Sequence, residues 1–332
     1  MKPIPQDISN TQTNWPAYWP LPNVDIEKNM LWNLHHGPGS TMKQLSTTRS
    51  WQEHEKIFLI DCEDISIYED SFINDERVHL FNPAVSDVDR QYLWLFWYDY
   101  CTKIEKDMKL YHRCLPTALK NPKFIFDSLL GTMHGRYHKH FVEQKILEHK
   151  HKSKFCTGLK NPNVCMDEDK KLDVGWVSGG DFDKGNKRVR HNEGPGNVAN
   201  VCRFIPYSIY NNSYYSLVCE TRGERYPFLT EKTAKPLLAK RIFVIFGSKG
   251  YLQGIKNIGF ETFSDILDES YDLIDDPETR WNKAWEQIEF LIDQDPVLLY
   301  KKVDNILEHN YNLMINNAWM QETVTKIEEL CV

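Results

Sequence analysis

The chain has no long hydrophobic run, since nowhere do about 18 apolar residues stand in succession, the length that a membrane-spanning helix needs. The first residues, Met1 to Asp7, are followed by no apolar stretch of the kind found in secretory signal peptides. These absences argue against a helical membrane anchor. They predict a cytoplasmic protein with no membrane partner.

Cysteine pairs with metal-binding spacing are also missing. The eight cysteines include no Cys-x-x-Cys sequence and are scattered through the chain. Free thiols in a reducing compartment account for this distribution, whereas a disulfide scaffold or structural zinc does not. His134, His138 and His140 stand close together, but no run of carboxylates accompanies them. The sequence therefore predicts no metal site.

Composition favours folded domains. With 332 residues, two domains of about 150 residues each are the better expectation. An apolar content of 41% is ample for packed cores. The formal net charge of −7 argues against a protein that coats nucleic acid non-specifically.

Basic residues nevertheless gather in the middle of the chain, at Lys150, Lys152 and Lys154, and then at Arg188 and Arg190. One interpretation is a solvated helix end and loop. The other is a phosphate-contacting edge that faces a nucleotide donor or a DNA acceptor.

Short apolar or β-branched runs bounded by polar residues predict strands at 56–61, 123–127, 215–219 and 242–246. Helix-period segments such as 141–147 lie between them. This alternation predicts an α/β fold with parallel sheets. Residues 161–200 are rich in Gly, Asn and charge, so we expect a linker or insertion between an N-terminal domain, 1–160, and a C-terminal domain, 201–332.

The segment 216–247 carries the most informative pattern: a strand, a charged helix start and a second strand that closes on Gly247. Thr230 is placed to cap a helix that opens at Glu231, leaving unpaired N–H groups for a diphosphate. Lys232 would stabilise the departing nucleotide, and Glu231 would hold two ribose hydroxyls. Lys235 follows in the same helix.

Glu220 ends the strand before this helix, where α/β sheets place ligand-binding groups. It either holds the ribose or base of a nucleotide or pairs with Arg222 or Arg225. Upstream, a second strand and Gly-containing turn lead to a basic helix start. This pattern resembles family 10 fucosyltransferases, in which an arginine here clamps phosphate, and the resemblance implies that role for Arg136, with Lys139 as the competitor. A guanidinium matches pyrophosphate bidentately, which an ammonium does not.

The string Phe228-Leu-Thr-Glu-Lys232, followed by Pro236 and an apolar strand ending in Gly, resembles the donor-binding motif of family 10 fucosyltransferases. It resembles still more a group of bacteriophage glycosyltransferases, with the later motifs at 250–252, 259–263 and 268–272. The resemblance is specific over 205–290, faint over 120–150 and absent from the first hundred residues.

The resemblance implies two Rossmann-like domains facing each other across a cleft, the GT-B-like glycosyltransferase fold. It gives Glu231 the ribose and Lys232 the phosphate of a UDP- or GDP-linked sugar, with no metal requirement. Phe228 stands where the fucosyltransferases have Tyr, so it would keep a stacking role and lose the hydroxyl.

Sugar transfer with inversion needs a group that takes the acceptor's proton, and the N-terminal half should supply it. Asp61, Glu63 and Asp64 follow a predicted strand and form the best cluster, and His36 lies in a Gly-rich segment. A retaining mechanism is equally compatible with the sequence.

Because the resemblance is to viral enzymes, the expected acceptor is a 5-hydroxymethylated pyrimidine in double-stranded phage DNA, modified in the host cytoplasm without an obligate protein partner. One alternative is an enzyme that decorates lipopolysaccharide or capsule glycans. Another is a non-catalytic DNA- or glycan-binding module of the same fold.

Overall fold

In the computed structural model, the chain forms two compact units. The first unit comprises Met1–Phe96 and Ala318–Val332, and the second comprises Trp97–Asn317. The residues described by the structure are 29–34, 56–61, 75–81, 122–130, 136–157, 207–223, 227 and 229–316, with 325 and 329 as single positions.

The described part of the first unit is a parallel sheet of β1 (Asn29–Leu34), β2 (Lys56–Asp61) and β3 (Val78–Phe81), in that order. Strand β2 confirms the prediction for 56–61, whereas β1 and β3 were not expected. Ahead of β3, the Arg77 guanidinium donates to the Asp75 carboxylate over 2.8 and 2.9 Å.

The second unit contains a four-stranded sheet with the order β5-β4-β6-β7, and every pair is parallel. Its strands are β4 (Phe124–Ser128), β5 (Phe155–Thr157), β6 (Ser213–Cys219) and β7 (Phe243–Phe246). Three of them confirm predicted strands, with ends shifted by at most two residues. Thus the predicted α/β architecture with a parallel sheet is observed.

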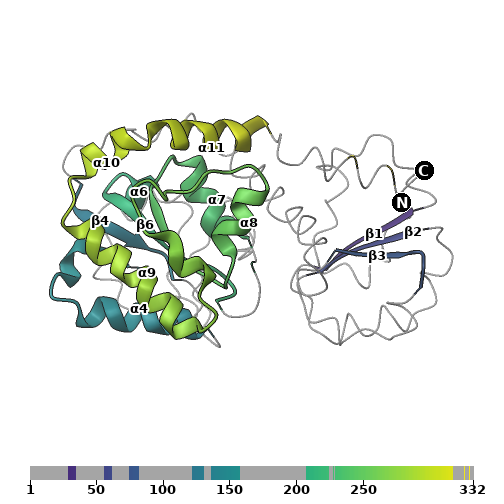
Figure 1. Cartoon of the computed structure of the whole chain (residues 1–332), viewed down its shortest axis with the longest axis horizontal. Helices are drawn as coiled ribbons and strands as arrows, with labels where there is room; N and C mark the ends of the chain where they lie inside the picture. Colours follow the sequence, from purple (N-terminus) through teal and green to yellow (C-terminus); the bar gives the residue numbers. More distant parts are fainter. Residues whose placement is uncertain are drawn as a thin grey trace, which may run out of the picture. The chain divides into compact units, whose positions relative to one another are not determined.

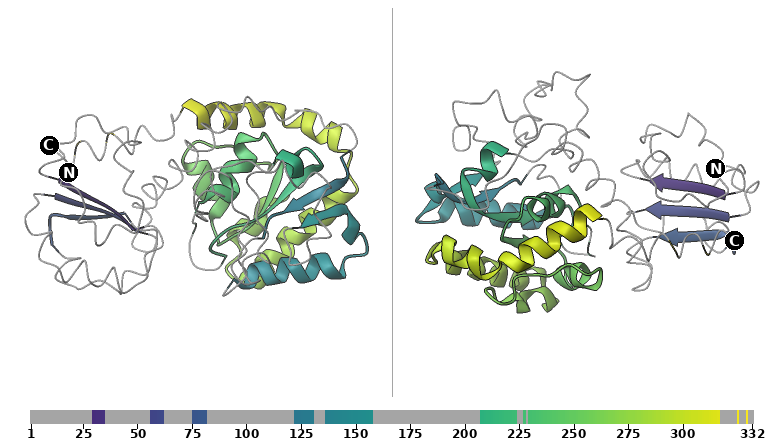
Figure 2. Two further views of the ribbon diagram at one scale, coloured as in Figure 1. Left: turned by 180° about the vertical axis from the view of Figure 1, so that it is seen from behind. Right: turned by 90° about the horizontal axis from the view of Figure 1, so that it is seen from above.

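Helices cover both faces of this sheet. Helix α4 (Tyr137–Glu148) connects β4 to β5 on one side, and α7 (Glu231–Leu238) connects β6 to β7 on the other. Crossovers between parallel strands are right-handed. The connection from β4 to β5 runs toward one edge of the sheet and that from β6 to β7 toward the other, so α4 and α7 lie on opposite faces. Figures 1 and 2 show α4 packed with α9 (Pro277–Ile292) on one side, and α7 with α11 (Asp304–Asn316) on the other.

Shorter helices complete the described part of the second unit. They are η6 (Lys152–Lys154), α6 (Tyr207–Tyr210), α8 (Tyr251–Asn257), η8 (Glu269–Leu273) and α10 (Pro296–Lys302). Two helices begin at Asp-Pro sequences: Asp276 caps α9 by accepting from the Thr279 amide at 2.8 Å, and Asp295 caps α10 by accepting from the Val297 amide at 2.8 Å.

Inside the sheet, a buried ion pair joins Asp127 of β4 to Arg241, just before β7, over 2.6 Å. The hydroxyls of Ser213 and Ser216 donate to the same carboxylate. This pair links strands that are far apart in sequence, and removing one partner would leave a buried charge uncompensated.

Strands β4 and β5 belong to the same sheet as β6 and β7, although the domain boundary predicted at 161–200 would fall between them. The pairing of Phe126 with Tyr215 joins the two halves of the sheet directly. Such parallel pairing depends on residues distant in sequence, so local composition does not reveal it. The segment 161–200 itself lies outside the described residues.

Two remaining expectations concern membranes and thiols. Within the described residues, no helix is both long and apolar enough to cross a bilayer. The two described cysteines, Cys156 and Cys219, are buried with free thiols.

Candidate functional site

The strand order places a candidate site at the carboxyl edge of the second sheet. Helix connections leave β4 and β6 in opposite directions, so a crevice is expected between the ends of these neighbouring strands. After those ends, the next helices along the chain are α4, which begins at Tyr137, and α7, which begins at Glu231. Ligands of open α/β sheets bind at such a point.

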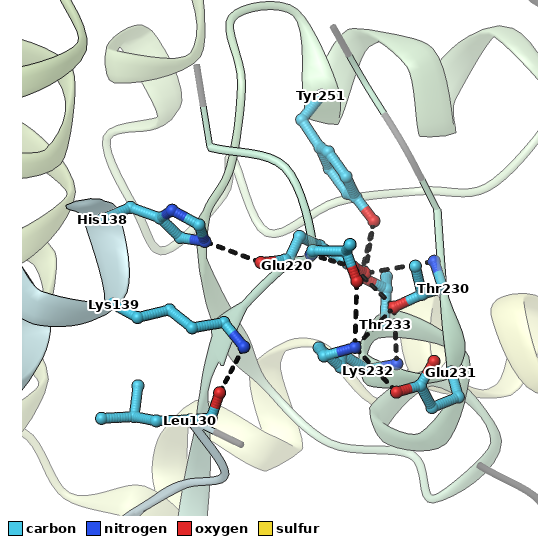
Figure 3. A network of polar contacts seen from close by, with 10 residues as sticks. Leu130, His138, Lys139, Glu220, Thr230, Glu231, Lys232, Thr233 and Tyr251 are labelled. Atoms are coloured by element: carbon cyan, nitrogen blue, oxygen red, sulfur yellow. Dashed lines mark hydrogen bonds and ion pairs between the residues drawn. The ribbon is translucent and has the colours of Figure 1, made fainter. Parts of the chain in front are cut away.

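Glu220, the residue after β6, organises this edge (Figure 3). One of its carboxylate oxygens accepts from the Thr221 amide at 3.1 Å and the Thr230 hydroxyl at 2.6 Å. The other accepts from the Thr233 hydroxyl at 2.5 Å, the Tyr251 hydroxyl at 2.8 Å and the Thr230 amide at 3.4 Å. Glu220 is fully buried, so it positions α7 and α8 and is not placed to hold a ligand.

Helix α7 begins as the sequence predicts. Thr230 is its N-cap and accepts from the Lys232 amide at 3.3 Å. The Lys232 ammonium donates to the hydroxyls of Thr221 and Thr230, at 3.1 and 3.3 Å, and to the Glu231 carboxylate at 2.7 Å. The two residues predicted to bind a donor therefore lie side by side at the helix start.

Glu231 is a strong acid in this setting. Burial would raise the pKa of its carboxyl, but the ammonium groups of Lys232 and Lys235 outweigh that effect and lower the pKa to about 2. The Glu231 side chain keeps 14% of its surface exposed and the Lys232 side chain keeps 20%, so a ligand can reach both.

Helix α4 approaches Glu220 from the other side (Figure 3). The His138 ring donates from Nε2 to the Glu220 carbonyl oxygen over 2.6 Å, which fixes the tautomer. Burial lowers the pKa of His138 to about 3, so the ring is neutral. A Cβ at Gly223 would lie 2.4 Å from His138 Nδ1, so only glycine allows this close contact.

Lys139 and Arg136 bring positive charge to the same edge. Lys139 is fully buried and donates to the Leu130 carbonyl oxygen. Burial, together with the charges of Lys232 and Arg136, lowers the pKa of Lys139 to about 7. The Arg136 guanidinium makes no hydrogen bond or ion pair to another described residue, and the carboxylates of Glu231 and Glu220 act on it electrostatically. Burial and then the charge of Arg222 lower its pKa.

Among the described residues, basic side chains outnumber carboxylates at this edge. The basic residues Arg136, Lys139, Arg222 and Lys232, which we call the cation cluster, act on one another and on the carboxylates Glu220 and Glu231. Mutual repulsion of buried cations is unfavourable, and an anionic ligand would relieve it. The arrangement is suited to a phosphate-containing molecule.

Arg280 of α9 fixes the loops around the site, a role that its sequence context does not reveal. Its guanidinium donates to the carbonyl oxygens of Gly223 at 3.0 Å and Gly247 at 3.2 Å. It also donates to Ile274 O at 2.6 Å and Asp275 O at 3.1 Å. One buried side chain thereby ties the segments after β6, β7 and η8 together.

The later motifs of the resemblance have structural roles in this fold. Asp272 accepts from the amides of Leu252 and Gln253 at the start of α8, at 2.9 and 3.0 Å. Glu269 accepts from the Thr262 hydroxyl at 2.5 Å and the Phe263 amide at 2.7 Å. These contacts hold the segment after β7 against η8.

The remaining predicted donor residues are placed as follows. Gly247 follows β7, and a Cβ there would lie 3.1 Å from the Tyr251 ring, so the glycine allows close packing. Lys235 is buried within α7, where its charge acts on Glu231. Phe228 lies outside the described residues.

In the first unit, Asp61 is the last residue of β2, paired with Leu34 at the carboxyl edge of that sheet. The other candidates for the catalytic base, Glu63, Asp64 and His36, lie outside the described residues, so the identity of the base stays a prediction.

The predicted acceptor-binding lysines are remote from the cation cluster. Lys150, Lys152 and Lys154 follow the C-terminal end of α4, whereas the cluster lies at its N-terminal end. A helix of 12 residues separates the two ends by about 18 Å. These lysines therefore belong to the opposite edge of the sheet. Arg188 and Arg190 lie outside the described residues.

Three residues of the site, His138, Thr233 and Tyr251, were not predicted as functional. Tyr251 stands in the Gly-Tyr-Leu motif, which was the available signal, and His138 had been considered only as a metal ligand. Over the described ranges, no group of three His, Cys, Asp or Glu side chains is arranged to hold a metal ion. Transfer without a metal stays a prediction.

The chain matches no protein-family model, no curated protein and no solved structure.

Proposed function

We propose that the protein is a glycosyltransferase that takes a sugar from a UDP- or GDP-linked donor. The diphosphate would bind between the first turns of α4 and α7, against Arg136 and Lys232. Glu231 would accept hydrogen bonds from the ribose hydroxyls. The observation that carries this proposal is that, among the described residues, basic side chains outnumber carboxylates at the carboxyl edge of β4 and β6.

The same residues supply a chemical role. When the bond between sugar and diphosphate breaks, negative charge develops on the leaving diphosphate. Lys232 and Arg136 would stabilise that charge from fixed positions, which is the usual source of catalysis by preorganised electrostatics. The first unit would supply the base, with Asp61 as the described candidate, in a GT-B-like arrangement of two α/β domains.

Calorimetric titration with UDP-glucose and GDP-mannose tests donor binding. Glu231→Ala and Lys232→Ala should each weaken binding about 10- to 100-fold, because each removes charge-assisted hydrogen bonds worth about 1.5–3 kcal/mol. Glu278→Ala and Lys301→Ala are matched controls at exposed positions and should bind like the unmodified protein. Equal affinity in all four variants would favour a non-catalytic module.

For the acceptor, we propose a 5-hydroxymethylated pyrimidine in double-stranded DNA. DNA that contains 5-hydroxymethylcytosine and otherwise identical unmodified DNA would be incubated with the panel of donors. Mass spectrometry of the released nucleosides should show a hexosyl or pentosyl mass gain only with the modified DNA. Transfer to free glycans and not to DNA would support the alternative role in lipopolysaccharide or capsule decoration.

A further inference from the structure

Lys139 is the one member of the cation cluster that the structure isolates from solvent completely. Its side chain is fully buried, and its ammonium donates to the Leu130 carbonyl oxygen, with no ion pair to a described carboxylate. The carboxylate of Glu220, directly after β6, already accepts five hydrogen bonds. The donors are the Thr221 amide, the Thr230 amide and hydroxyl, and the hydroxyls of Thr233 and Tyr251. An uncompensated ammonium in this position is costly.

Charged and titratable groups from three parts of the chain act on Lys139 or on its neighbours. They are Arg136 and His138 at the start of α4, Cys219 and Glu220 at the end of β6, and Glu231 and Lys232 at the start of α7. Two of them do not titrate near neutrality, because burial lowers the pKa of His138 to about 3 and raises that of Cys219 to about 12.

The remaining surroundings favour the neutral amine in the empty site. Burial and then the charges of Lys232 and Arg136 lower the pKa of Lys139, and the weaker opposing effect of Glu231 does not offset them. A bound diphosphate would reverse this balance by placing anionic oxygens beside the first turns of α4 and α7. The ligand would then favour the ammonium form.

We propose that Lys139 takes up a proton when the diphosphate of a nucleotide sugar binds, so that the ligand itself completes the positive charge of the site. This inference rests on the proposed donor site. The proton moves from solvent to the Lys139 amine, and no covalent bond to the ligand forms or breaks.

Proton uptake follows directly from this linkage. In the empty site Lys139 loses its proton around pH 7. The number of protons taken up on binding should therefore be about 0.2 at pH 6.5 and about 0.9 at pH 8. Affinity should fall by up to about tenfold for each pH unit above neutrality.

Calorimetry of UDP-glucose and GDP-mannose binding measures the uptake on the unmodified protein, from the dependence of the observed enthalpy on the buffer's ionisation enthalpy. Nucleotide sugars are the right probes, because the terminal phosphate of a free nucleoside diphosphate itself titrates near about pH 6. Tris and HEPES at pH 8 and PIPES and ACES at pH 6.5 avoid phosphate, which would compete for the site.

Lys139→Met and Lys139→Arg separate the residue's role from general packing. An arginine stays charged between pH 6 and pH 8. The Lys139→Arg variant should therefore take up no proton when it binds the nucleotide sugar, and its affinity should fall less over this pH range. The methionine variant should bind more weakly and also without uptake.

Binding without proton uptake at pH 8 in the unmodified protein would overturn the inference and leave the donor site standing. Unchanged uptake in Lys139→Met would do the same. If neither nucleotide sugar binds at any pH, the donor site and the inference both fail.

Discussion

Glu220→Gln tests whether one buried carboxylate holds the candidate site together. The substitution keeps the size of the side chain but replaces one acceptor oxygen with an amide N–H₂ group. Each oxygen of Glu220 accepts from a backbone amide, either that of Thr221 or that of Thr230. Whichever oxygen is replaced, two N–H groups then face each other, and a buried backbone donor loses its partner.

The expected magnitude follows from these contacts. A buried donor left without a partner costs about 1–3 kcal/mol. Hydrogen bonds to a neutral amide are about half as strong as those to a carboxylate, which weakens the contacts from Thr233 and Tyr251 as well. Relief of the buried charge offsets part of this loss. We expect Glu220→Gln to lower the free energy of unfolding by about 2–4 kcal/mol.

Thermal unfolding measures the effect. For a unit of this size, about 3 °C of melting temperature corresponds to 1 kcal/mol, so Glu220→Gln should lower Tm by about 6–12 °C. Tyr251→Phe removes one hydroxyl and should cost about a third as much, and Glu278→Gln at an exposed position serves as the control. A Tm within 1 °C of the control would refute the role given to Glu220.

Two further predictions concern His138. Gly223→Ala would place a methyl group 2.4 Å from Nδ1 and 2.9 Å from Cβ of His138, so we expect a loss of about 1–3 kcal/mol by overpacking. Urea denaturation should show a smaller loss in a His138→Ala background, and equal losses would contradict the contact. The folded chain keeps His138 neutral, with a pKa of about 3, whereas the unfolded chain takes up a proton below 6.5. Stability should therefore fall by about 2 kcal/mol from pH 7 to pH 5. Urea titrations at both pH values should show a smaller fall in His138→Gln, and an unchanged fall would assign it to other groups.

Features set by neighbouring residues were predictable from the sequence. The strands β2, β6 and β7 are short apolar runs with polar boundaries. The burial of β6 and β7 follows from their own side chains. The cap at Thr230 depends on the amide of Lys232, two residues away. The strand β5 escaped prediction because its three residues are too few to show a pattern.

Features set by distant residues were not predictable in this way. The contact of His138 with the Glu220 carbonyl oxygen spans 82 positions, and it exists only because β4 and β6 pair. The same holds for the approach of Lys139 to Lys232. Charge composition likewise does not say at which edge of a sheet a lysine will lie, which is why Lys152 was grouped with the site and lies away from it.

The second unit contains both a buried ion pair, Asp127 with Arg241, and the cation cluster. Their charge balance distinguishes a structural ion pair from a binding site. At Asp127 and Arg241, one carboxylate faces one guanidinium, and Ser213 and Ser216 complete the hydrogen bonds, so charge is balanced within the protein. At the cation cluster, basic side chains outnumber the carboxylates that the structure describes, and Arg136 makes no ion pair to a described carboxylate. A purely structural network gains nothing from such an imbalance, because the repulsion destabilises the folded chain. A site that must hold a diphosphate needs it, since the missing negative charge arrives with the ligand.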